Sequence, residues 1–105
     1  EALGEKAAFV LDVKQAHRSG YDPLEIVRAL EENIRHVHFS DHGKAGDCLK
    51  FGFGEYDNFT LFSELKKYGY DGNVIIELYR GSHGGAKDLA ENCRELNKFL
   101  TENNF

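Results

Sequence analysis

The alternation of two kinds of apolar pattern constrains the fold of this chain more than any other feature. Three short apolar runs of strand length, at 7–12, 34–39 and 74–78, alternate with three longer segments at 22–33, 57–69 and 86–101. In the longer segments apolar residues recur every three or four positions, as on one face of a helix. Strands that alternate with helices pair in parallel through right-handed connections. We therefore predict an α/β fold of three consecutive βα units with parallel strands.

Capping residues mark the ends of the predicted helices. Asp22 precedes Pro23 at the start of the first helix, Asp57 or Asn58 starts the second, and Gly69 ends it. The predicted apolar stripes are Leu24, Val27 and Leu30, then Phe59, Phe62 and Leu65, and finally Leu89, Cys93, Leu96 and Leu100. The segments between, 13–21 and 42–56, are predicted as loops. The glycine-rich "GFGEYD" in the second loop is expected to form a turn, because it lacks the spacing of a nucleotide-binding loop.

Length and charge limit the classes of function. The chain has 105 residues, enough for one core, so 1–105 is expected to be a single unit. A formal charge of −5 disfavours a broad surface for nucleic acid or anionic lipid. No apolar run approaches the length of a bilayer span, and residues 1–8 lack the pattern of a signal peptide. We expect a cytoplasmic protein that acts on small molecules, with Cys48 and Cys93 as free thiols.

Each predicted strand carries a polar side chain at or next to its end. Because side chains alternate between the two faces of a strand, we expect Asp12, His38 and Glu77 on the face opposite the helices. The carboxyl ends of parallel strands meet at one edge of a sheet, where sites collect. A single such carboxylate is as often an acceptor of hydrogen bonds from a loop backbone as it is a functional group. Three polar groups at one edge favour a shared ligand. Two carboxylates and one imidazole suit Mn²⁺, Zn²⁺, Co²⁺, Fe²⁺ or Mg²⁺ in a catalytic site.

Further residues near these strand ends are candidates for supporting roles. Lys14 and Arg80 follow strand ends and are predicted to bind a phosphate or hydroxyl group of a substrate, with solvated loop cations as the alternative. His36 lies deeper on its strand and is expected to be a hydrogen-bonded core residue beside the metal ligands. Asp41 is expected to orient its loop or a ligand. His42, in the following loop, is expected to face solvent.

Three segments together carry a family resemblance. "LDVKQAHRSGYDP", then "RHVHFSDH" followed by "GDCLKFGFGEYDNF", and finally "YDGNVIIELYRG" resemble the last three βα units of the xylose-isomerase-like TIM barrels. This superfamily includes sugar-phosphate isomerases and epimerases and the endonuclease-IV-type DNA repair enzymes. The resemblance covers roughly residues 8–100 and is most specific in the H-V-H-x-S-D and Y-D-G-x-V-x-x-E motifs.

The resemblance implies roles for individual residues. Asp12 matches the sixth-strand aspartate ligand, His38 the seventh-strand histidine, and Glu77 the eighth-strand glutamate, which also moves the proton in the isomerases and epimerases. A fourth ligand, a glutamate on an earlier strand, has no counterpart in this chain. Gln15 stands where many members have a histidine, and it can hydrogen-bond a sugar hydroxyl. Asp47 lacks the partner histidine of the nuclease branch.

These observations predict part of a metal-dependent sugar or sugar-phosphate isomerase or epimerase. Such enzymes transfer a proton through a metal-stabilised enediolate. Two alternatives remain open. One is an endonuclease-IV-like DNA repair nuclease, and the other is a non-catalytic flavodoxin-like binding or interaction module whose polar strand-end side chains only form hydrogen bonds with loop backbone groups.

The number of βα units also has a consequence for assembly. A complete barrel has eight units and about 250 residues. Three units leave two sheet edges and the inner face bare, and the absence of an initiator methionine is expected for a C-terminal piece of a longer protein. We expect the chain alone to be inactive, and to form a homo-oligomer or to associate with the missing barrel portion.

Overall fold

The computed structural model describes residues 8–105 and confirms the predicted α/β fold with parallel strands. Its elements are β1 Phe9–Asp12, α2 Val13–Arg18, α3 Pro23–Leu30, the 3₁₀ turn η1 Glu31–Asn33, β2 Ile34–Phe39, β3 Asp41–Gly43, β4 Gly46–Leu49, α4 Asn58–Lys67, β5 Val74–Ile76, the 3₁₀ turn η2 Arg80–Ser82 and α5 Ala86–Glu102. The parallel sheet has the order β1-β2-β5, and β3 and β4 form an antiparallel hairpin. Ala7, predicted to start the first strand, lies outside the described residues.

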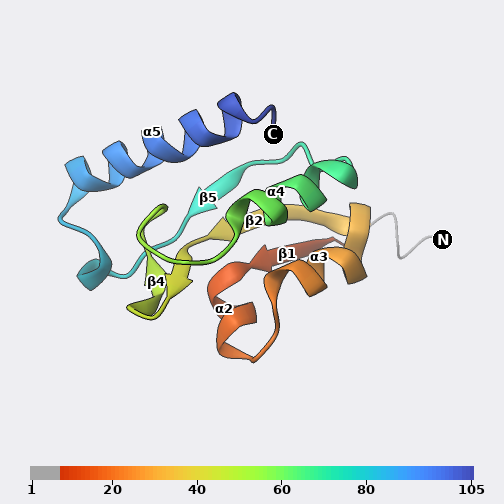
Figure 1. Ribbon diagram of the computed structural model, residues 1–105, viewed down its shortest axis with the longest axis horizontal. Helices are drawn as coiled ribbons and strands as arrows, with labels where there is room; N and C mark the ends of the chain where they lie inside the picture. Colours follow the sequence, from red (N-terminus) through yellow and green to blue (C-terminus); the bar gives the residue numbers. More distant parts are fainter. Residues whose placement is uncertain (1–7) are drawn as a thin grey trace.

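Two short elements follow strand ends where loops were predicted. α2 begins directly after β1, and the β3–β4 hairpin follows β2 after one residue. Figure 1 shows both at the same end of the molecule, beyond the ends of β1 and β2. The loop prediction is wrong for these segments because a helix of six residues and strands of three and four residues are too short to display a periodic pattern.

The helix boundaries predicted from capping residues are confirmed. Asp22 caps α3, its Oδ1 accepting a hydrogen bond from the Leu24 backbone N–H at 3.0 Å. Asp57 caps α4 through the Thr60 backbone N–H at 3.1 Å. Gly69 follows α4 with a φ of +80°, a conformation that glycine adopts without strain.

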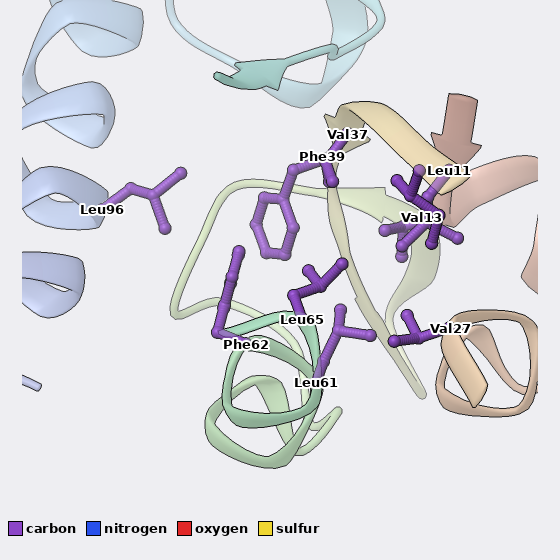
Figure 2. Packing of buried hydrophobic residues seen from close by; sticks show 10 residues of the cluster. Leu11, Val13, Val27, Val37, Phe39, Leu61, Phe62, Leu65 and Leu96 are labelled. Carbon is purple, nitrogen blue, oxygen red and sulfur yellow. The ribbon is translucent and has the colours of Figure 1, made fainter. Parts of the chain in front are cut away.

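The core lies between one face of the sheet and the helices. Its buried residues are Leu11, Val13, Val27, Ile34, Val37, Phe39, Leu61, Phe62, Leu65 and Leu96. Figure 2 shows Phe39 beside Phe62 and Leu65 of α4, with Leu96 pointing toward it from α5. Phe59, predicted to belong to this stripe, is exposed instead and contacts Phe105, with ring centroids 5.4 Å apart. Leu61 takes its place, because Asn58, Leu61, Phe62 and Leu65 form the buried face of α4.

The opposite face of the sheet is open. Val10 is 50% exposed, Ile75 is 44% exposed, and His36 between them is also exposed. Within the described residues β1 and β5 each pair only with β2, so each has a free edge. The expectation that His36 lies in a core is wrong, because nothing in the described part of the chain covers this face.

α5 is fastened by its middle to the loop after the hairpin. The Asn92 side chain donates to the Phe51 carbonyl at 3.0 Å and accepts from its N–H at 2.9 Å. Toward β5, a groove of about 690 Å³ separates strand from helix, and Cys93, predicted on the buried stripe, lines it and is exposed. Both cysteines are free, as predicted. No helix in the described part of the chain combines the length and apolar character needed to cross a bilayer.

Candidate metal centre

Three polar side chains converge where the parallel strands end. Asp12, His38 and Glu77 each offer one ligand atom, and these atoms all lie within 4.8 Å of one another. The strand register brings them together: Asp12 is paired with His38, and His38 is paired with Ile75, two residues before Glu77. The Glu77 backbone N–H donates to the Phe39 carbonyl at 2.9 Å and so continues the pairing beyond β5. The geometric premise of the sequence prediction, a common rim for the three residues, therefore holds.

The three donors fit a divalent cation chemically. His38 Nδ1 lies 3.1 Å from Glu77 Oε2. Ligand atoms bound at about 2.1 Å to one cation lie roughly 3 to 4 Å from each other, so small side-chain rotations suffice to bring all three donors to such a distance. The His38 and Glu77 side chains are 32% and 43% exposed, which leaves them open to a ligand from solvent. A set of two carboxylates and one imidazole is the mixed oxygen and nitrogen set of catalytic divalent metals.

Asp12 also has a purely structural task. Its Oδ1 accepts a hydrogen bond from the Gln15 backbone N–H at 3.0 Å and so caps α2. This is the loop-capping role that the sequence left open. A carboxylate has a second oxygen with its own lone pairs, so the cap and a metal contact are compatible.

Lys14 lies against the glutamate of this cluster. Its side chain is 8% exposed, and Nζ is 3.4 Å from Glu77 Oε1 and 4.3 Å from the centre of the Tyr79 ring. Tyr79, followed by Glu77, raises the pKa of Lys14 above its ordinary value, so the ammonium group stays charged at neutral pH. The predicted role of Lys14 in substrate binding stays a prediction.

Arg18 extends these contacts to the hairpin. Its Nη1 donates to the Tyr79 hydroxyl at 2.6 Å, while Nε and Nη2 donate to the two carboxylate oxygens of Asp47 at 2.5 and 3.3 Å. The guanidinium group holds the pKa of Asp47 below its usual range. Sequence reasoning missed Arg18 and Tyr79. For Arg18, the sequence signal was its four-residue spacing from Lys14, which would place both side chains on one face of a helix.

The other predicted substrate residues lie near the same edge. Gln15 is exposed on α2 and, with Asp12, lines a shallow hollow of about 250 Å³. Arg80 lies in η2, three residues after Glu77. Their roles in substrate binding stay predictions.

Asp41 organises the loop after the hairpin. It is buried, and its carboxylate accepts hydrogen bonds from the backbone N–H groups of His42, Gly52 and Gly54 and from the Asn58 side chain, at 2.9 to 3.3 Å. A Cβ added at Gly54 would lie 2.5 Å from the His42 carbonyl oxygen, so only glycine fits there. The glycine-rich segment thus forms a turn around a buried carboxylate. These contacts give Asp41 its role in orienting the loop, while a role toward a metal ligand stays a prediction.

Comparison with known proteins identifies the family. The family model "Xylose isomerase-like TIM barrel" matches residues 2–102, and the chain belongs to this family. The chain is similar to an inosose dehydratase of Lacticaseibacillus casei, with 28% identity over 91 residues that cover 70% of this chain and 30% of the relative. The inosose dehydratase of Lacticaseibacillus casei strain BL23 matches to the same extent.

A solved structure shows the same likeness. The crystal structure of a D-tagatose 3-epimerase-like protein matches with a TM-score of 0.71 and 28% identity, covering 92% of this chain and 36% of that chain. This chain therefore spans about a third of the length of the proteins that it matches. These comparisons confirm the predicted resemblance and the partial-barrel architecture, and the relatives are sugar-modifying enzymes by name. The family is one of TIM barrels and not of flavodoxin-like folds.

Proposed function

We propose that this chain forms part of a divalent-metal-dependent isomerase or epimerase of a sugar or sugar phosphate. The observation that supports the proposal is the convergence of Asp12, His38 and Glu77 within 4.8 Å at the carboxyl ends of three parallel strands. Family membership adds to it, because the relatives are named as an inosose dehydratase and a tagatose 3-epimerase-like protein.

The reactions in those two names share one chemical step. Both epimerisation beside a ketone and dehydration of a β-hydroxy ketone begin with the removal of a proton from a carbon next to a carbonyl group. When bound, a divalent cation would polarise that carbonyl and stabilise the negative charge that develops beside it. Asp12, His38 and Glu77 are the residues of this chain that would hold it.

Glu77 is the residue that we assign to proton transfer. Its Oε2 lies beside His38, while Oε1 lies beside Lys14, so the two oxygens have different neighbours. One oxygen can serve as a ligand while the other takes up the proton and returns it to carbon. Return of this proton to the former carbonyl carbon, with the hydroxyl proton passing between the two oxygens, gives isomerisation. Epimerisation at the same carbon needs a proton delivered to the opposite face of the planar intermediate, and therefore a second acid besides Glu77.

Metal titration tests the ligand set on the chain itself. We expect Mn²⁺ to bind in isothermal titration calorimetry, and Glu77→Gln or Asp12→Asn to weaken binding by about 100-fold or more, since loss of a ligand should exceed the 10- to 100-fold cost of losing a supporting residue. His36→Asn is the control, because His36 lies on the same strand and face as His38 but outside the cluster. Equal Mn²⁺ affinity in all these variants would overturn the ligand assignment.

An isotope experiment tests the reaction with the intact protein. We expect deuterium from D₂O to enter ketose or ketose-phosphate substrates at a carbon next to the carbonyl, and Glu77→Gln to stop this exchange. Cleavage of an abasic DNA duplex is expected to be absent, because Asp47 is engaged by Arg18 and lacks the partner histidine of the nuclease branch. Metal-dependent abasic cleavage without isotope exchange would replace the sugar proposal with the nuclease alternative.

A further inference from the structure

We propose that Lys14 is a positioning residue that fixes the carboxylate of Glu77 for metal binding. We also propose that Tyr79, Arg18 and Asp47 hold Lys14 in place and thereby link the β3–β4 hairpin to the metal centre. We call these four residues the clasp. The proposal rests on the proposed function only in so far as Glu77 is a metal ligand.

The first step concerns the freedom of the Glu77 side chain. This side chain is 43% exposed, and an exposed glutamate samples many rotamers. Here Lys14 Nζ lies 3.4 Å from Oε1 and His38 Nδ1 lies 3.1 Å from Oε2. Two contacts on opposite oxygens define the plane of the carboxylate, and the Lys14 contact directs Oε2 toward His38.

The second step concerns what holds Lys14. Its stem is buried, and its ammonium group is 4.3 Å from the centre of the Tyr79 ring, within range of a cation–π contact. The Tyr79 hydroxyl accepts from Arg18, and Arg18 binds both oxygens of Asp47 on β4. A bidentate arginine–carboxylate pair has a defined geometry, so the hairpin sets the position of the Tyr79 ring over Lys14.

A second lysine in the same chain makes the same kinds of contact away from the strand ends. Lys50 Nζ lies 3.1 Å from both carboxylate oxygens of Asp88 and 4.2 Å from the centre of the Phe53 ring. This group fastens α5 to the loop after the hairpin and has no ligand of the metal cluster among its contacts in the described structure. Lys50 therefore provides a matched control, with an ion pair and a ring contact but no link to Glu77.

Metal affinity is the first measurement. We expect Lys14→Met to weaken Mn²⁺ binding by about 10- to 100-fold and Lys14→Arg to restore part of the loss, because arginine keeps the charge and the donors. Lys50→Met should leave the affinity unchanged. Asp47 is linked to Lys14 only through Arg18 and Tyr79, so Asp47→Asn is expected to weaken Mn²⁺ binding only a few-fold. Tyr79→Leu should repeat the effect of Lys14→Met, which covers the case in which Lys14→Met fails to fold.

The geometry of Glu77 is the second measurement and needs no metal. We expect Lys14→Met to shift the NMR signals of the Glu77 carboxyl carbon and of His38 Nδ1 in metal-free protein, whereas Lys50→Met should leave both signals in place. If the wild type binds Mn²⁺ and Lys14→Met binds it equally well, the positioning role is overturned while the proposed function stands. If the wild type binds no Mn²⁺, the proposed function loses its ligand set, and unchanged NMR signals in Lys14→Met would then overturn the clasp as well.

Discussion

The two faces of the parallel sheet differ in what covers them. On the covered face, Leu11, Val37 and Phe39 are each 1% exposed or less and pack against the helices. On the open face, Val10 and Ile75 are about half exposed. The polar residues of the candidate metal centre lie on the open face, so one face supplies the stability of the fold and the other carries the candidate site.

The difference arises within single strands. His38 and Phe39 are neighbours in sequence, yet the imidazole reaches the metal cluster while the phenyl ring lies in the core. Because side chains alternate along a strand, a shift of one residue in register would exchange the two environments. The apolar side chains of the covered face therefore also fix the position of the candidate ligands.

The largest expected effect is the loss of a core side chain from the covered face. Phe39→Ala removes a ring that lies 5.7 Å from the Phe62 ring and 6.0 Å from the Phe51 ring, measured between centroids. We expect the free energy of unfolding to fall by about 3 to 5 kcal/mol, because the deletion loses buried apolar surface and leaves a cavity. Urea denaturation followed by circular dichroism measures this change.

Ile75→Ala is the matched control on the open face. Since 44% of Ile75 is already exposed, its truncation should cost about 1 kcal/mol or less. Equal losses for the two variants would show that the open face is covered in solution and would remove the distinction between the faces.

The second effect concerns association through the open face. We predict that the chain self-associates, because Val10 and Ile75 are exposed beside two free strand edges in the described structure. Replacing both residues by lysine should weaken self-association by about 30-fold, since each apolar contact contributes about 1 kcal/mol. Size-exclusion chromatography with light scattering over a range of concentrations measures this. A wild-type chain that stays monomeric at every concentration would contradict the prediction.

The sequence predicted the parallel fold well because long-range order in this chain follows from local patterns. Strand runs, capping residues and helical stripes are each readable over five to fifteen residues, and parallel pairing follows from their alternation. α2 and the hairpin escaped prediction because each is too short to show a periodic pattern, and the contacts that hold this region reach distant residues. Asp41, for example, organises its loop through hydrogen bonds that reach 17 residues along the chain.

The candidate site was predictable only in part, for a related reason. Side-chain alternation places Asp12, His38 and Glu77 on one face, and strand order brings them together. No local pattern shows that Tyr79 lies over Lys14, because these residues are 65 positions apart in the sequence. Likewise, His36 was expected in a core because it lies deeper on its strand than His38, and the described part of this chain covers only one face of that strand.

The smallest effect distinguishes two histidines of the same segment, His36 on the open face and His42 beyond the strand. His42 was expected to face solvent, but it is buried between His17 and Tyr56, at ring-centroid distances of 4.1 and 4.5 Å. Burial, followed by the charge of His17, lowers the pKa of His42, while Asp41, Asp22 and Asp47 act in the opposite direction. The neutral form of His42 is therefore the one that the fold favours.

The sign of the pH dependence follows from this lowered pKa. As the pH falls below about 6.5, the unfolded chain takes up the His42 proton before the folded chain does, so the stability contributed at neutral pH is lost. We expect the free energy of unfolding to fall between pH 7 and pH 5 with a slope of at most about 1.4 kcal/mol per pH unit from this group.

Two variants assign that slope to a residue. His42→Leu should make it shallower because leucine cannot take up a proton, and His36→Leu, at an exposed position on the open face, is the control for replacing an imidazole by leucine. Denaturation at pH 7, 6 and 5 stays above the range in which ordinary carboxylates titrate, so the comparison isolates histidine protons. An unchanged slope in His42→Leu would contradict the assignment to His42.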